Sequence, residues 1–271
     1  MDKENSLDDT ADRYRAPALE KGLDILELLA NHSGGLSKGE VARALERSPN
    51  EIYRMLSTLL RRGYISQSSS GDRYGLSLRM FSLSHKHPPV NRLIEIALPQ
   101  IRAVTRKIWQ SCHLAMENNG EIVIVASVES PGYWSLALRT GSVMGLGNTG
   151  SGRVMAAFRP RDEINDLLLH HSPTLGEPTI DQAAFFKRLD SIRAQGFEAL
   201  PSDTAAGITN IAFPILDLTG RSVAVVSCPY LARIDDLEIP GIPEVQKVIG
   251  NLAHTLSNQY GGAMPGQKEI L

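Results

Sequence analysis

Two helix-start signals lie close together in the N-terminal part of this 271-residue chain. They are Ser37-Lys38-Gly39-Glu40 and Ser48-Pro49-Asn50-Glu51. In such a capping box, the serine side chain accepts a hydrogen bond from an early backbone N–H group, while the glutamate three residues later reaches back to the serine N–H. The second signal also has proline at the first helical position, where its missing N–H does no harm. Two short helices with separate start signals and few residues between them predict a helix-turn-helix.

The second of these helices, over residues 49–62, has two chemically different faces. Its apolar side chains recur at the spacing of a core-facing stripe: Ile52, Met55, Leu56, Leu59 and Leu60. The opposite face carries polar side chains: Asn50, Arg54, Ser57 and Arg61, with Tyr53 near the border. A packed helix with a solvated face is one interpretation. In a helix-turn-helix, however, the second helix enters the DNA major groove, where arginine can read guanine and asparagine can read adenine.

A hairpin is expected directly after this helix. Residues 64–67 and 74–76 read as strands around the turn sequence SSSGDR, which gives the element order of a winged helix-turn-helix. We expect Arg73 at the wing tip and Lys38 against phosphate, and we interpret Glu51 as a helix cap. The residues predicted to bind double-stranded DNA are Lys38, Ser48, Asn50, Tyr53, Arg54, Ser57, Arg61 and Arg73.

Charge and cysteine content limit the possible classes of protein. The net charge is −2, but the basic excess is local, since residues 16–89 hold ten Lys+Arg against seven Asp+Glu. Two cysteines are too few for a disulfide framework and show no metal-ligand spacing. The first residues are polar and acidic, and no apolar run reaches membrane-spanning length. We therefore expect a cytoplasmic protein with no membrane partner.

The remainder of the chain mixes strand and helix patterns without regular β-α-β alternation. Strands are predicted over residues 114–117, 122–128, 135–138, 197–200, 209–215 and 222–227. Helices are predicted near residues 90–111, 152–158, 162–170, 181–195 and 243–259. The pattern indicates an α+β fold with a mainly antiparallel sheet.

A glycine-rich segment, Gly145-Leu146-Gly147-Asn148-Thr149-Gly150, satisfies the pattern G-x-G-x-x-G. A nicotinamide site is not expected, because no β-α-β unit follows within the required distance. The loop still opens a predicted helix, whose free backbone N–H groups favour an anion such as a small carboxylate. The alternative is a loop that needs glycines only for its backbone angles.

Signals for catalysis and metal binding are weak. Gly150-Ser151-Gly152 lacks the outer glycines of a nucleophile elbow, and the histidines do not assemble a metal set. Cys228 either lines a pocket or is simply packed. We predict no catalytic residue, metal or cofactor.

The sequence resembles the IclR family of bacterial transcription regulators, over about residues 17–260. IYRMLSTLLRRGYI is similar to the family's recognition helix running into the wing, and GFEALPSDTAAGITNIAFPILDLTGRSVAVVS to its most recognisable effector-domain segment. The resemblance implies a winged helix-turn-helix, a linker helix and a GAF-like α/β effector-binding domain. The implied boundaries are a disordered arm at residues 1–15, the winged helix-turn-helix at 16–87 and the linker helix at 88–111. The effector-binding domain would span residues 112–260, followed by a flexible tail at 261–271.

The resemblance also implies where a small effector binds. The matching positions are Leu146, Asn148, Thr149, Gly150, Ser151, Gly152, Asp203, Asn210, Ser227 and Cys228. The chain departs from the family's common pattern at and beside these positions: Asn210 stands in place of a frequent cysteine, and the neighbouring Arg153 in place of lysine.

These features together predict a ligand-responsive transcription regulator. The resemblance implies that it pairs into dimers or tetramers on a palindromic operator, with repression favoured and activation left open, and we expect its effector to be a carboxylated or aromatic small molecule. The alternatives are a metabolite-binding enzyme with an appended helix-turn-helix and a small-molecule binder that never touches DNA. Salt-steep binding to a specific duplex would separate the regulator from both.

Overall fold

The computed structural model describes residues 16–84, 86, 88–235 and 237–261, which divide into two compact units between Pro88 and Pro89. The predicted arm, residues 1–15, and all of the predicted tail except Gly261 lie outside the described residues. Among the residues described, no helix is both long and apolar enough to cross a membrane.

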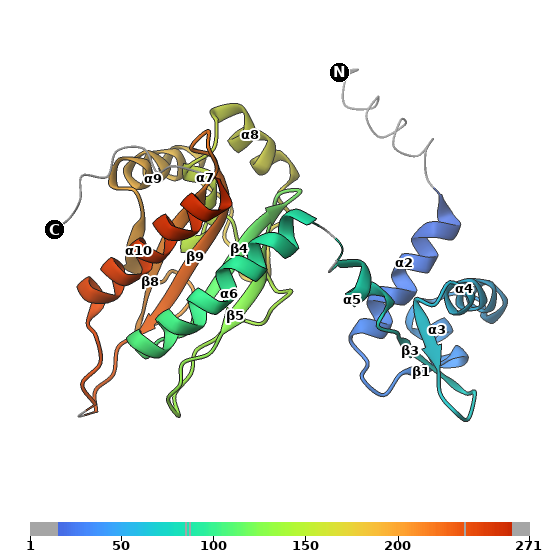
Figure 1. The fold of residues 1–271 in the computed structure, drawn as a ribbon. Coiled ribbons are helices and arrows are strands. Elements are labelled where there is room, and N and C mark those ends of the chain that lie inside the picture. Colours follow the sequence, from blue (N-terminus) through green and yellow to red (C-terminus); the bar gives the residue numbers. More distant parts are fainter. Residues whose placement is uncertain (1–15, 85, 87, 236, 262–271) are drawn as a thin grey trace, which may run out of the picture. The chain divides into compact units, whose positions relative to one another are not determined.

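The first unit is a winged helix-turn-helix (Figure 1). Its elements are α2 (Pro17–Ala30), β1 (Leu36–Ser37), α3 (Lys38–Ala44), α4 (Pro49–Arg61), β2 (Ile65–Gln67), β3 (Arg73–Leu76) and α5 (Arg79–Ser84). Both predicted capping boxes are confirmed, since Ser37 and Ser48 each accept from the backbone N–H of the glutamate three residues later. The three strands form an antiparallel sheet in the order β1-β3-β2, in which β1 was not predicted.

The second unit is built on a six-stranded antiparallel sheet in the order β6-β5-β4-β9-β8-β7. The strands are β4 (Cys112–Asn118), β5 (Glu121–Val128), β6 (Val143–Met144), β7 (Glu198–Pro201), β8 (Ile208–Leu216) and β9 (Ser222–Leu231). The helices are α6 (Pro88–Ile108), α7 (Gly150–Ala157), α8 (Arg161–His170), α9 (Gln182–Gln195) and α10 (Ile242–Tyr260). The predicted α+β class with an antiparallel sheet is confirmed.

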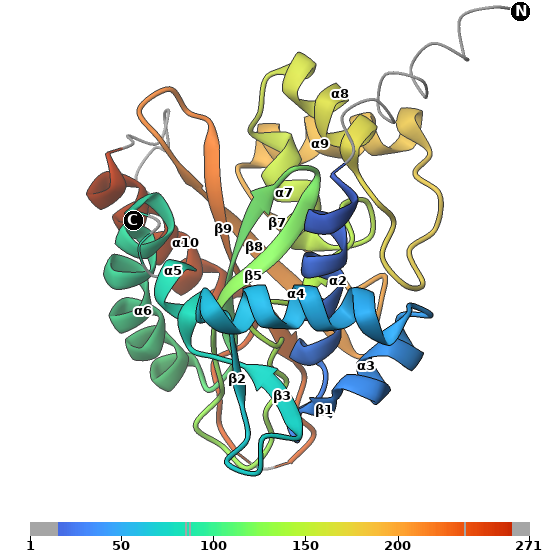
Figure 2. The same cartoon turned by 90° about the vertical axis from the view of Figure 1, so that its right-hand side faces the viewer.

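Helices cover both faces of this sheet (Figure 2). Helices α6 and α10 pack on one face, and α7, α8 and α9 pack on the other. Because consecutive strand residues point to opposite faces, Phe213 of β8 faces α10 while Ala212 faces α7. Helix α6, expected as a linker, is itself part of this packing, since Leu93, Ala97 and Ile101 are fully buried against the sheet.

The strand predicted over residues 135–138 is wrong. These residues have no regular structure, and the edge strand beside β5 is instead β6, which pairs with Ile122 and Val123. Alternation of apolar and polar residues indicates only that a segment could be a strand; pairing with a neighbouring strand decides whether it is one.

Candidate functional site

The outward face of α4 carries most of the side chains predicted to bind DNA. Asn50, Tyr53, Arg54, Ser57 and Arg61 are all exposed, while the apolar stripe of the helix packs into the core of the first unit. Among the residues that the structure describes, neither Arg54 nor Arg61 has an acidic partner. Unpaired guanidinium groups beside an amide and a hydroxyl leave this face able to contact phosphate and base edges.

Lys38 and Ser48 lie beside this face but have contacts of their own. The Lys38 ammonium group lies 5.5 Å from the centre of the Tyr53 ring, so it links the start of α3 to α4. The Ser48 hydroxyl accepts from the Glu51 N–H at 3.4 Å and lies 2.9 Å from the Glu51 carboxylate. Ser48 therefore serves as a helix cap.

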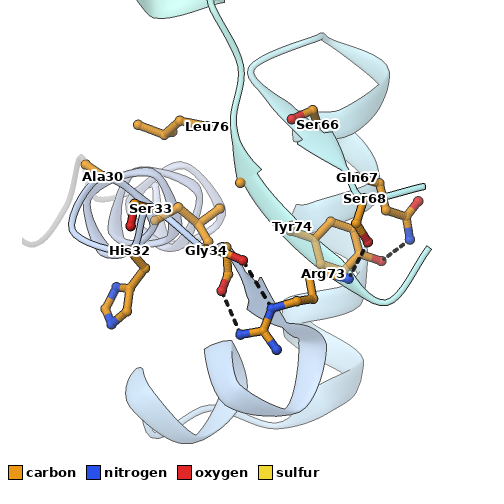
Figure 3. Close-up of a pocket in the computed structure, with 13 residues that line it drawn as sticks. Ala30, His32, Ser33, Gly34, Ser66, Gln67, Ser68, Arg73, Tyr74 and Leu76 are labelled. Atoms are coloured by element: carbon orange, nitrogen blue, oxygen red, sulfur yellow. Dashed lines mark hydrogen bonds between the residues drawn. The ribbon is translucent and has the colours of Figure 1, made fainter. Parts of the chain in front are cut away.

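Arg73 does not lie at the wing tip. It begins β3 opposite Ser37, and its guanidinium donates to the carbonyl oxygens of Gly34 at 3.2 Å and Gly35 at 2.9 Å (Figure 3). It also lies 3.3 Å from the Glu40 carboxylate. The unpredicted strand β1 explains the difference, because pairing with β1 brings Arg73 to the turn after α2. Arg73 thus joins the wing to this turn, beside a groove of about 380 Å³.

An ion pair that the sequence did not indicate joins α2 to α4. Lys21 Nζ lies 2.7 Å from Glu51 Oε1. Hydrogen bonds from Lys21 and Ser48 hold the pKa of Glu51 at about 2, so its carboxylate remains ionised. The interpretation of Glu51 as a cap is confirmed, since it also accepts from the Ser48 N–H.

In the second unit, the glycine-rich loop ends at the N-terminus of α7. Thr149 is the N-cap: its hydroxyl accepts from the Gly152 N–H at 3.1 Å and donates to the Gly145 carbonyl at 2.6 Å. The backbone N–H groups of Gly150 and Ser151 have no acceptor among the described residues. Leu146 is fully buried in the core under α7. The helix start therefore presents free donors and the positive end of its dipole.

A buried hydrogen-bond chain connects α7 to the sheet. Ser151 Oγ lies 3.0 Å from Ser227 Oγ on β9 and 3.1 Å from His113 Nε2 on β4. All three residues are buried. The sequence analysis named both serines but missed His113, since no local pattern places it beside them.

A buried ion-pair network lies next to this chain. The Arg153 guanidinium donates to both carboxylate oxygens of Glu198, to the Gly147 carbonyl at 3.0 Å and to Asp203 at 2.7 Å. Burial opposes the charge of Arg153, but the two carboxylates outweigh it and raise its pKa. Arg188 lies 3.3 Å from Glu198 as well. Asp203, predicted to contact the effector, is therefore bound to Arg153 in this structure.

The two predicted asparagines flank the start of α7. Asn210 of β8 lies beside Gly150, since a Cβ atom added to that glycine would be 3.2 Å from Asn210 Cβ. The Oδ1 atom of Asn148 is buried without a hydrogen-bond partner among the described residues. Glu177, which the sequence did not indicate, accepts from the Gly147 N–H at 3.0 Å and lies 3.0 Å from His171.

Cys228 does not join these residues. It is buried in the core cluster that also contains α6 and α10, on the opposite face of the sheet from the Ser227 side chain. Adjacent strand residues point to opposite faces, so Ser227 and Cys228 cannot both face α7. The thiol instead contacts Cys112, and this contact and burial raise the pKa of Cys228 well above its usual value.

Comparison with known families accounts for both units. The description "Bacterial transcriptional regulator IclR C-terminal" matches residues 89–257, more than half of the chain, and "IclR helix-turn-helix domain" matches residues 18–69. The chain belongs to the IclR family. It is therefore a transcriptional regulator with a DNA-binding helix-turn-helix and an effector domain, and its family is not one of enzymes.

Individual IclR-family proteins are moderately similar. The chain is 26% identical over 193 residues to the HTH-type transcriptional regulator KdgR of Escherichia coli K12, covering 70% of this chain and 73% of KdgR. It is 23% identical over 214 residues to the HTH-type transcriptional repressor AllR of the same strain, covering 78% of this chain and 79% of AllR. An IclR homologue from Microbacterium hydrocarbonoxydans, solved with 4-hydroxybenzoate, shares the fold with a TM-score of 0.74 at 18% identity. The match covers 90% of this chain and 98% of that homologue.

Acid should weaken the second unit through His113. Burial lowers the pKa of His113 to about 4, from an ordinary value of 6.5. The unfolded chain binds this proton near pH 6.5 and the folded chain only near pH 4, so stability is complete above pH 6.5 and falls as the pH drops to 4. We expect His113 to account for a loss of about 3 kcal/mol in this window. Urea denaturation at several pH values should show a flatter profile for His113→Phe, and an unchanged profile would exclude His113 as the cause.

Proposed function

We propose that this IclR-family protein is a homodimer, or a dimer of dimers, that represses genes by occupying a palindromic operator until a small organic acid binds the second unit. The exposed face of α4 with Arg54 and Arg61 is the observation that carries the DNA part, and a two-fold protein matches two inverted half-sites. The name of AllR supports repression, and the ligand of the Microbacterium homologue supports a carboxylated or aromatic effector. Because bacterial DNA lies in the cytoplasm, so would the protein.

The effector would act by preferring one arrangement of the assembly. A ligand shifts such an equilibrium only as far as its affinities for the two arrangements differ. Free N–H groups at Gly150 and Ser151 would take its carboxylate, because the N-terminus of α7 favours an anion. Helix α6 is the first helix of the chain after α5 of the DNA-binding unit, and it packs on the sheet of the effector unit, so it is the element through which a change at the sheet would be passed on.

Arg54→Ala should weaken specific DNA binding by about 1–3 kcal/mol if Arg54 reads a base. The measurement is a fluorescence anisotropy titration, at fixed salt, against a duplex that the protein has selected from genomic fragments. Arg102→Ala removes an exposed arginine of α6 and should leave operator affinity unchanged. Wild-type operator affinity in folded Arg54→Ala would remove Arg54 from the base-reading residues.

Ser151→Asp should block the effector response and spare operator binding in the folded variant, although a carboxylate at this buried position also lowers the stability of the second unit. The new carboxylate would lie at the α7 start, where it repels an anionic ligand, and Gly150→Val tests the same place by crowding Asn210, whose Cβ would lie 3.2 Å from the added Cβ. A screen of organic acids for operator release would supply the effector, and calorimetry would measure its affinity for each variant. Unchanged effector affinity in both variants would contradict this placement of the site.

A further inference from the structure

A row of polar side chains crosses the face of the sheet that α7 covers. The strand register pairs His113 of β4 with Ser127 of β5 on one side and with Ser227 of β9 on the other. Directly opposed residues share one face of a sheet, so the three side chains stand side by side. Ser151 of α7, the helix packed on this face, is hydrogen-bonded to both His113 and Ser227.

Two atoms in this row have no hydrogen-bond partner within the described part of the chain. They are His113 Nδ1 and Ser127 Oγ, and both atoms are buried. The whole His113 residue is only 5% exposed. Buried polar atoms in folded proteins nearly always have a hydrogen-bond partner. A buried polar atom without one has lost its hydrogen bonds to water and gained none in return, which costs free energy. The row is therefore incomplete, and it would be completed by a further polar group.

The charges nearby decide which polar group fits. Arg153, the buried cation of α7, is already bound to Glu198 and Asp203. His113 is neutral, since burial lowers its pKa to about 4. A second ionised carboxylate placed on this row would lose its hydration without gaining a counter-charge. A hydroxyl group carries no charge, and it can donate to one atom while accepting from the other, whichever nitrogen of His113 bears the proton.

We propose that His113 and Ser127 form a subsite for an un-ionised hydroxyl group of the effector, and that the effector is accordingly a hydroxylated organic acid. This inference rests on the proposed function: the carboxylate would bind the N-terminus of α7 and the hydroxyl would bind the row beneath it. The two places are adjacent, because Ser151 belongs to both. A site built to bond a hydroxyl discriminates strongly against the analogue that lacks it, since its buried polar groups are then left unpaired.

Pairs of acids that differ by one hydroxyl test the subsite. Calorimetry with the full-length protein would compare 4-hydroxybenzoate with benzoate, 4-hydroxyphenylacetate with phenylacetate, and 3-hydroxybutyrate with butyrate, with succinate as a second-carboxylate probe. We expect at least one hydroxylated acid to bind at least about 100-fold more tightly than its partner. That ratio should fall below about 10-fold in His113→Phe and in the milder Ser127→Ala, and persist in His254→Phe, which replaces an exposed histidine.

Several results would overturn the subsite. They are equal binding within every pair, a preference for succinate, no binding of any hydroxylated acid at millimolar concentration, or a ratio that survives both variants. Equal binding within every pair would mean that a buried water completes the row in place of a ligand. Operator binding is measured separately, without any acid. If the protein binds a specific duplex but one of the results above is found, only this inference fails. If it binds no specific duplex, the proposed regulator fails as well.

Discussion

Replacing Glu198 by glutamine is expected to lower the free energy of unfolding of the second unit by about 3 kcal/mol. The Glu198 side chain is fully buried and binds the Arg153 guanidinium through both carboxylate oxygens. The glutamine keeps the shape but removes the charge. Arg153 would then remain buried with only Asp203, whose side chain is 54% exposed, as a counter-ion. Urea denaturation followed by circular dichroism and by fluorescence of Trp109 and Trp134 would measure the change, since both tryptophans lie in this unit.

Two further variants separate charge burial from a general effect of mutation. Arg188→Gln removes the half-exposed partner of the same carboxylate and should cost less than about 1 kcal/mol. Replacing Arg153 and Glu198 together by methionine and leucine should recover most of the loss, because no buried charge is then left unpaired. If Glu198→Gln were no more harmful than Arg188→Gln, the network would not stabilise the unit in this way.

Gly152→Ala should destabilise the second unit by about 3 kcal/mol. An added Cβ would lie 2.6 Å from the carbonyl oxygen of Gly145 and still closer to that of Leu146. These are backbone atoms of the glycine-rich loop, which cannot rotate away as a long side chain would. The loop would have to move, and the Thr149 cap, which also bonds to Gly145, would be disturbed. Differential scanning calorimetry would measure the decrease in the midpoint temperature of unfolding of the second unit.

The matched control for this substitution is Gly39→Ala. Gly39 is also helical, but no atom lies within 4 Å of its added Cβ. Alanine favours a helix over glycine, so this variant should keep or raise the stability of the first unit, by at most about 1 kcal/mol. A loss in Gly39→Ala as large as in Gly152→Ala would show that close packing of the loop is not the reason.

The predicted helix starts were correct because each depends on residues a few positions apart. Ser37 with Glu40, and Ser48 with Glu51, form their capping boxes within one helical turn. The apolar stripe of α4 also follows from helical spacing alone, which left its polar face exposed. Strand predictions succeeded where turns and alternation agreed, and failed at residues 135–138, where no neighbouring strand pairs.

The candidate site was predicted only in part, because a site is a set of distant contacts. The glycine-rich segment correctly indicated a helix N-terminus, capped by Thr149. The pattern could not show that Ser227 faces this helix while Cys228 faces away, since that depends on strand register. Nor could it show that Arg73 would turn toward Gly34 and Gly35, because strand β1 has only two residues and a weak signal.

The sequence by itself determined the helix-turn-helix, the α+β class and the family, since these depend on local spacing and on segments of the chain that can be recognised alone. Only the tertiary structure decided which buried polar groups meet. His113 reaches Ser151 across 38 positions, and Ser151 reaches Ser227 across 76. Arg153 finds Glu198 across 45 positions. Which of these side chains meet depends on the register of the strands and on the position of the helix packed on the sheet. Local sequence patterns encode neither.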